Sequence, residues 1–156
     1  MDLQLKGRSA LSTGSTAVFG LAIAVSLARE GAHVTVTGRT QERLNNALHI
    51  RERVPDARAN GIAADLGTAI GAAAVVRQLP EVHILVNILG IFEATPFEKT
   101  DDAVWSRLFE VNVLSGLRLS RHYLPLMKHK NWAASCSFPA NRPRRFLQKN
   151  DSLRSN

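Results

Sequence analysis

The sequence has little cysteine and no long hydrophobic run. Cys136 is the only cysteine, which excludes an intramolecular disulfide framework and is typical of a protein in a reducing compartment. No run of about 18 apolar residues occurs, so we expect no membrane-spanning helix. Residues 1–6 do not form the apolar core that a signal peptide needs. We therefore expect a soluble, cytoplasmic protein.

Acidic residues are too few to balance the basic ones, and the formal net charge is +7. A basic excess is typical of proteins that bind nucleic acid. Much of the excess lies in residues 133–156, which hold five basic residues and one acidic residue, whereas the rest of the chain is closer to balance. This distribution argues against nucleic acid as a partner. A basic tail that binds nucleic acid, carried by an unrelated fold, is the alternative.

Short apolar runs alternate with longer helical segments up to Trp132, in a chain of 156 residues that is long enough for one domain and too short for two. The runs with strand character are Ser9–Ser12, His33–Thr37, Arg58–Ala64 and Val82–Val86. The helical segments are Val18–Glu30, a segment capped by Thr40 and running to Arg53, Leu66–Leu79 and Asp101–Met127. This alternation predicts right-handed βαβ units and a parallel sheet.

The regular pattern ends after Trp132. Residues 133–156 contain two prolines and many serine, asparagine and arginine residues, a composition that is typical of loops and disordered segments. The alternative is a poorly patterned fifth strand at Ser135–Phe138. We therefore divide the chain into a domain of residues 1–132 and an irregular basic tail of residues 133–156.

Four short motifs occur in a characteristic order within residues 5–132. They are TGSTAVFGLAIA at 13–24, ADL at 64–66, NILG at 87–90 and VNV at 111–113. They resemble the TGxxxGxG turn, the adenine-contacting acidic position, the NNAG motif and the asparagine-bearing helix of the short-chain dehydrogenases/reductases. The sequence around the first motif is most similar to the 3-oxoacyl-carrier-protein reductase-like branch of this family. The resemblance implies an α/β fold with a Rossmann-like, doubly wound parallel sheet, incomplete here, with strand order 3-2-1-4 and a remnant of a fifth strand.

The resemblance also implies a set of cofactor-binding residues: Gly14, Ser15, Gly20, Arg39, Asp65, Asn87 and Gly90. Gly14 permits a sharp turn, and the helix that follows directs its free N–H groups at the phosphates of the cofactor. Gly20 lets that helix pack closely on the sheet. The alternative is that both glycines serve only the turn and the packing.

Two charged positions of this set carry further expectations. Arg39 follows the second strand, where an NAD-binding fold usually has an acidic residue, and a guanidinium there suits the 2′-phosphate of NADP. An arginine that is merely solvated is the alternative. Asp65 is expected to accept a hydrogen bond from adenine or, alternatively, to be the N-cap of the third helix.

Asn87 ends the most buried strand, beside the crevice where ligands bind.

Two residues depart from the family pattern and predict weak or impaired NADP binding. Val18 stands where the turn usually has its middle glycine, and a positive φ at this position would cost about 1–3 kcal/mol. Ile88 replaces the second asparagine of the NNAG motif. We therefore expect NADP rather than NAD as the cofactor, bound with reduced affinity.

Most of the family's catalytic residues have no counterpart in the sequence. The family reduces a carbonyl with serine, tyrosine and lysine, assisted by an asparagine that corresponds to Asn112; a structural hydrogen bond is the alternative role for Asn112. Tyr123 is the only tyrosine, and Met127 stands where the lysine would be. We interpret the break in pattern as truncation, with a change of reading frame from about Ala133.

The sequence therefore predicts a homologue of NADP-dependent short-chain dehydrogenases/reductases, which transfer a hydride between nicotinamide and a carbonyl or alcohol. We expect most of the cofactor-binding half to be retained and catalysis to be lost, with no indication of the small-molecule substrate. A non-catalytic nucleotide-binding or regulatory module that pairs with a full-length relative is the alternative.

The last predicted helix carries an apolar stripe: Val104, Leu108, Val111, Leu114 and Leu117. We expect this stripe to face the core and Pro125 to end or kink the helix. Trp105, Phe109 and Val113 of the same helix are expected to lie bare, as is the free edge of the fourth strand unless the Ser135–Phe138 segment covers it. Both surfaces predict self-association or pairing with a relative.

Overall fold

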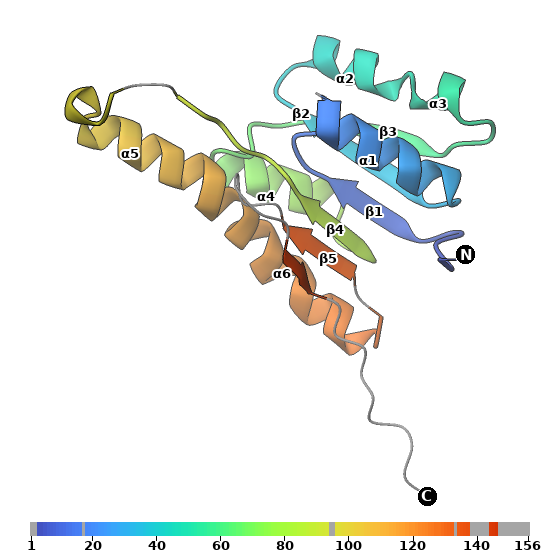
Figure 1. Ribbon diagram of the computed structural model, residues 1–156. Coiled ribbons are helices and arrows are strands. Elements are labelled where there is room, and N and C mark those ends of the chain that lie inside the picture. The colour runs from blue at the N-terminus through green and yellow to red at the C-terminus, as the bar shows by residue number, and fades with distance from the viewer. Residues whose placement is uncertain (1–2, 17, 94–95, 133, 138–143, 147–156) are drawn as a thin grey trace, which may run out of the picture.

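The computed structural model describes residues 3–16, 18–93, 96–132, 134–137 and 144–146. These residues form a central sheet with helices on both faces (Figure 1). The strands are β1 Ser9–Ser12, β2 His33–Gly38, β3 Ala59–Ala63, β4 Ile84–Asn87, β5 Ala134–Ser137 and β6 Arg144–Phe146. The helices are α1 Val18–Arg29, α2 Gln41–Leu48, α3 Ile50–Arg53, α4 Ala69–Gln78, α5 Asp102–Phe109 and α6 Ser115–His129.

The strands lie in the order β3-β2-β1-β4-β5-β6. The pairs among β1 to β5 are parallel, whereas β6 is antiparallel to β5. The predicted α/β class and the strand order 3-2-1-4 are thus confirmed. The interpretation of the whole segment after Trp132 as irregular is wrong, because β5 pairs with β4 where the alternative placed a fifth strand. The pairing depends on main-chain N–H and C=O groups at the edge of β4. A pattern of hydrophobic side chains does not predict such main-chain hydrogen bonds.

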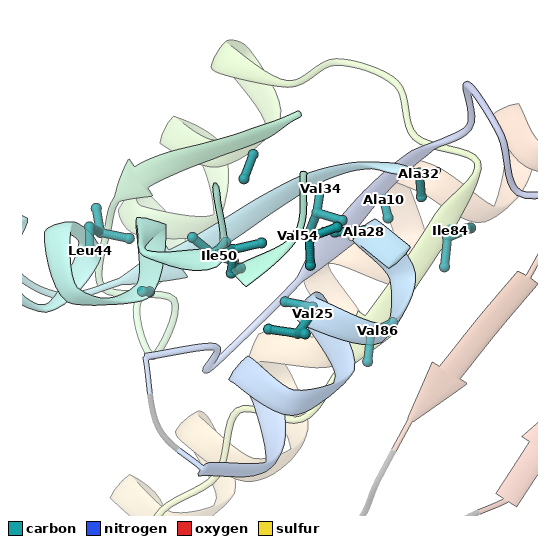
Figure 2. Packing of buried hydrophobic residues seen from close by; sticks show 14 residues of the cluster. Ala10, Val25, Ala28, Ala32, Val34, Leu44, Ile50, Val54, Ile84 and Val86 are labelled. Atoms are coloured by element: carbon teal, nitrogen blue, oxygen red, sulfur yellow. The ribbon is translucent and has the colours of Figure 1, made fainter. Parts of the chain in front are cut away.

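Alternate residues of the buried strands face two separate cores. Ala10 of β1 packs in the core beneath α1, α2 and α3, whereas its neighbour Leu11 packs in the core beneath α4 and α6. Figure 2 shows the first core, where Val25 and Ala28 of α1 lie over Val34 of β2. All four residues of β4 are buried, as expected of a parallel strand covered on both faces.

The segment capped by Thr40 differs slightly from its prediction. The Thr40 hydroxyl accepts a hydrogen bond from the backbone N–H of Arg43 at 3.4 Å, which confirms the N-cap. The expected single helix to Arg53 is instead two helices, because α2 ends at Leu48 and α3 begins at Ile50.

The last long helix contains a π-helical segment, Glu110–Leu114, between α5 and α6. A π-helix adds residues to a turn, so the buried stripe continues in α6 on Ser115, Leu119, Tyr123 and Met127. Leu117, which the helical period placed in the core, is instead 48% exposed.

Pro125 does not end the last helix, which continues to His129. Proline removes one N–H group from the helix, and this loss is tolerated where water can reach the carbonyl that is left. Both Pro125 and Arg121, whose carbonyl group is affected, are exposed. Within the part of the chain that the structure describes, no helix has the length and hydrophobicity needed to cross a membrane.

Candidate nucleotide-binding site

The turn between β1 and α1 is attached to the end of β4. Thr13 donates its backbone N–H to the carbonyl oxygen of Val86 at 2.9 Å. The Thr13 hydroxyl oxygen accepts from the N–H groups of Ile88 at 3.0 Å and Leu89 at 3.2 Å. These bonds hold together the carboxyl ends of two neighbouring parallel strands, which is where doubly wound sheets bind ligands. Thr13 was not predicted as a site residue, although it is part of the first motif.

Gly14 and Gly20 are both required by the geometry of this turn. Gly14 has φ +62°, a left-handed conformation that side chains disfavour. A Cβ atom on Gly20 would lie 2.7 Å from the carbonyl oxygen of Gly14 and 2.7 Å from the Cα of Ser15. The first turn of α1 therefore lies directly against the loop, with its amino end beside Gly14.

Ser15 and Val18 lie in the same turn and at the start of the helix that follows it. Ser15 is fully buried, and its hydroxyl donates to the carbonyl oxygen of Ser12. Val18 is the first residue of α1 and therefore has a helical backbone. The positive φ that would strain a valine at this position is not needed.

A cavity of about 650 Å³ opens beside this turn. Its walls come from the β1–α1 turn, the end of β2, the loop between β3 and α4, the segment after β4, and α5 with the π-helical segment. Four of the predicted cofactor residues line it, namely Gly14, Arg39, Asp65 and Gly90. The other three, Ser15, Gly20 and Asn87, are buried behind its surface.

The Asp65 side chain caps a turn rather than the helix. Its Oδ1 accepts from the N–H of Gly67 at 3.0 Å. Thr68 is the N-cap of α4, and its hydroxyl accepts from the N–H of Gly71 at 3.0 Å. The alternative that made Asp65 the helix cap is therefore wrong, because α4 begins at Ala69 rather than near Leu66. Asp65 is exposed and lines the cavity.

Most of the charged groups around the cavity have partners. Arg107 forms an ion pair with Glu93 at 3.5 Å, and Glu110 forms one with Arg118. For the described residues, the ion pairs of the structure involve neither Arg39 nor Arg43, and both of these arginines line the cavity. The end of the cavity at β2 and α2 is therefore positively charged and suited to an anion.

Asn112 fixes the segment that follows Gly90. Its Oδ1 accepts from the N–H of Ile91 at 2.7 Å, and its Nδ2 donates to the carbonyl oxygen of Ile91 at 3.0 Å. The π-helical segment places the Asn112 side chain against this loop. The structural role of Asn112 is thus confirmed, and both polar groups of its side chain are engaged.

Asn87 ends β4 with one polar group left over. Its Nδ2 donates to the Ser120 hydroxyl oxygen at 3.2 Å. Its Oδ1 is buried and has no hydrogen-bond partner among the described residues. Buried acceptors of this kind are rare in native proteins.

Comparison with known proteins assigns the fold to a family. The sequence profile of the short chain dehydrogenase family matches residues 8–134. The chain belongs to the short-chain dehydrogenase family. The family likeness covers every wall of the cavity, including the turn at Gly14 and the helix that carries Asn112.

Individual short-chain dehydrogenases resemble the chain over about half of their own length. The uncharacterized oxidoreductase YvaG of Bacillus subtilis (strain 168) is 46% identical over 131 residues, which are 83% of this chain and 50% of that protein. The uncharacterized oxidoreductase YvrD of the same organism is 46% identical over 134 residues, 84% of this chain and 50% of that protein. The chain therefore spans about half the length of these curated relatives.

Solved structures of short-chain dehydrogenases also superimpose on the chain. L-sorbose reductase from Gluconobacter frateurii, complexed with NADPH and L-sorbose, gives a TM-score of 0.80 at 31% identity and covers 88% of this chain and 54% of its own. A 3-oxoacyl (acyl-carrier-protein) reductase from Agrobacterium tumefaciens C58 with NADP bound gives a TM-score of 0.77 at 27% identity, over 85% of this chain and 52% of its own.

Tyr123 does not replace the catalytic tyrosine of the short-chain dehydrogenases. Its side chain is fully buried in the core beneath α4 and α6, and its hydroxyl donates to the carbonyl oxygen of Leu79 at 2.6 Å. Burial raises the pKa of Tyr123 to about 12. A phenol in this position cannot exchange a proton with a ligand in the cavity near neutral pH.

Proposed function

We propose that this chain is the cofactor-binding part of an NADP-dependent short-chain dehydrogenase and that it binds NADP in the cavity beside the β1–α1 turn. The observation that carries the proposal is the positively charged end of a cavity at the carboxyl ends of parallel strands, with Arg39 where an NAD-binding site would have an acidic residue. NADPH and NADP in two superimposing relatives support the same conclusion.

The residues around the cavity fit such a cofactor. The amino end of α1 and the Gly14 turn would hold the pyrophosphate, because free N–H groups and the helix dipole favour anions there. Arg39 would bind the 2′-phosphate and Asp65 the adenine amino group. Gly90 would contact the nicotinamide half, with Asn87 at the end of β4 behind it. When bound, NADPH would supply a hydride, and the residues of the cavity wall would hold and orient the cofactor.

We further propose that these residues alone do not reduce a carbonyl. A positioned acid or base contributes roughly 10²–10⁴-fold to the rate. Within residues 1–156 no tyrosine is followed four positions later by lysine, and the Tyr123 hydroxyl is committed to Leu79. Asn112 positions the loop after Gly90 and does not itself supply the proton.

Calorimetric titration with NADPH and NADH tests the proposal. We expect NADPH to bind, with modest affinity, and NADH to bind more weakly, because NADH lacks the phosphate that Arg39 would contact. Arg39→Ala should reduce this preference, while Arg29→Ala, at the far end of α1, should not. Equal binding of both cofactors, or tight NADH binding that ignores Arg39→Ala, would contradict it.

We also propose that the chain is cytoplasmic. As an alternative role, we propose that the chain associates with itself or pairs with a full-length relative. The exposed apolar side chains of α5, the π-helical segment and α6 support this second proposal.

A further inference from the structure

A second arginine lines the positively charged end of the cavity. Arg39 follows Gly38, the last residue of β2, and Arg43 lies in the first turn of α2. Both arginines line the cavity. The Thr40 cap between them binds the backbone N–H of Arg43, so the backbone that carries both arginines has a defined conformation.

Among the described residues, no acidic side chain forms an ion pair with Arg39 or Arg43. Asp65 and Glu110 are the two acidic residues in the cavity wall. The Asp65 carboxylate accepts from the Gly67 N–H, and the Glu110 carboxylate is paired with Arg118. Glu42 shares the first turn of α2 but does not line the cavity. The amino end of α2 adds the positive end of a helix dipole to the same region.

We propose that Arg43 is a second specificity-determining residue and that Arg39 and Arg43 together bind the 2′-phosphate of NADP. This inference rests on the proposed function. A phosphate monoester carries close to two negative charges at neutral pH and three terminal oxygens. One guanidinium donates in a planar fork to two such oxygens. A second guanidinium satisfies the third oxygen and balances the second charge.

The two arginines also define what the site rejects. NADH has a hydroxyl group in place of the phosphate, so neither guanidinium gains a charged partner when NADH binds. Because both side chains are exposed in this structure, water solvates them in the absence of ligand. The discrimination therefore comes from the charge-assisted hydrogen bonds formed with the phosphate rather than from a penalty on the hydroxyl.

Adenosine 2′,5′-bisphosphate and 5′-AMP test this inference directly, because they differ only in the 2′-phosphate. We expect Arg43→Ala to weaken binding of the bisphosphate by about tenfold, the usual scale of a charge-assisted hydrogen bond. Binding of 5′-AMP should change less than about twofold in the same variant. Arg43→Lys should retain part of the affinity, since it keeps the charge and loses the fork.

Arg29→Ala is the matched control, because it removes an exposed arginine that does not line the cavity. The double variant Arg39→Ala/Arg43→Ala should lose an amount that is not the sum of the two single losses, since both residues contact one phosphate. Thermal unfolding of each variant would confirm that the exposed substitutions leave the fold intact.

The outcomes separate this inference from the proposed function. If the unaltered chain prefers the bisphosphate and Arg43→Ala behaves like Arg29→Ala, Arg43 has no role and the inference is wrong, while the proposed function stands. If the unaltered chain binds the bisphosphate no better than 5′-AMP and NADPH no better than NADH, both are wrong. A loss confined to the bisphosphate supports both.

Discussion

His83, which precedes β4, joins three strands at the end of the sheet opposite the cavity. Its Nδ1 accepts from the Ser9 hydroxyl at 2.8 Å and from the Ser9 N–H at 3.2 Å. Its ring meets Trp132 edge to face at 5.8 Å, and its carbonyl oxygen accepts from the N–H of Ala134 at 3.3 Å. Protonation of Nδ1 would remove the acceptor of the Ser9 N–H and would reverse the bond with the Ser9 hydroxyl.

We expect the free energy of unfolding to decrease as the pH falls through and below the ordinary histidine pKa of about 6.5. Burial lowers the pKa of His83, and the nearby charges of Arg8 and Lys130 lower it further, while Glu81 opposes them. The unfolded chain therefore binds more protons than the folded chain. The stability that His83 contributes is complete above the ordinary histidine pKa and is lost as the pH falls toward the lower pKa of the folded state.

Urea unfolding of the unaltered chain and of His83→Gln at several pH values measures this effect. The variant should have a shallower dependence on pH. His129→Gln, which alters an exposed histidine at the end of α6, should keep the original dependence. Parallel curves for the unaltered chain and His83→Gln would show that the Ser9–His83 contact does not couple to protonation.

At the scale of elements, the contact of α1 with the β1–α1 turn predicts opposite effects for two helical glycines. Gly20→Ala should destabilise the fold by roughly 1–3 kcal/mol, because its Cβ would lie within 2.7 Å of Gly14 and Ser15 backbone atoms. Gly116→Ala, whose Cβ would lie 3.6 Å from the nearest Asn87 atom, should stabilise α6 by about 0.5–1 kcal/mol. Thermal unfolding measures both, and equal shifts would contradict the tight packing of α1.

Apolar runs and helical spacing predicted those elements whose side chains pack in the two cores. β1 to β4 and α1 lie close to their predicted ranges, because a misplaced residue there would bury or expose a whole apolar face. The sequence pattern did not predict the π-helical segment, because this segment depends on backbone hydrogen bonds rather than on side-chain type. Its added residue exposed Leu117 and shifted the buried stripe to Leu119 and Tyr123.

The candidate site was predictable where a motif fixes the backbone. Gly14, Arg39, Asp65 and Gly90 line the cavity as expected. Arg43 could not be recognised in the sequence, because its place in the cavity depends on where β2 ends and how Thr40 caps α2. The burial of the Ser15 side chain likewise involves a hydrogen bond to the Ser12 carbonyl oxygen, which no sequence motif predicts.

At the scale of the whole molecule, one helical face predicts association. Trp105 is 52% exposed, Phe109 55%, Val113 40% and Leu117 48%. These four residues, spaced four apart, form an apolar stripe that crosses from α5 into α6, and α5 extends past the sheet in Figure 1. The second surface expected to promote association, the edge of β4, is occupied by β5.

We expect the chain to form dimers or larger species in a concentration-dependent way, because a contiguous apolar face on a soluble domain usually binds a partner. Size-exclusion chromatography with light scattering across a concentration series measures this. Phe109→Glu should shift the chain toward the monomer. Ile70→Glu is the matched control, since Ile70 is 81% exposed on α4 and lies outside the stripe, and it should associate like the unaltered chain. A monomer at every concentration, with no binding of a dye that reports apolar surface, would show that the stripe has no partner in this chain.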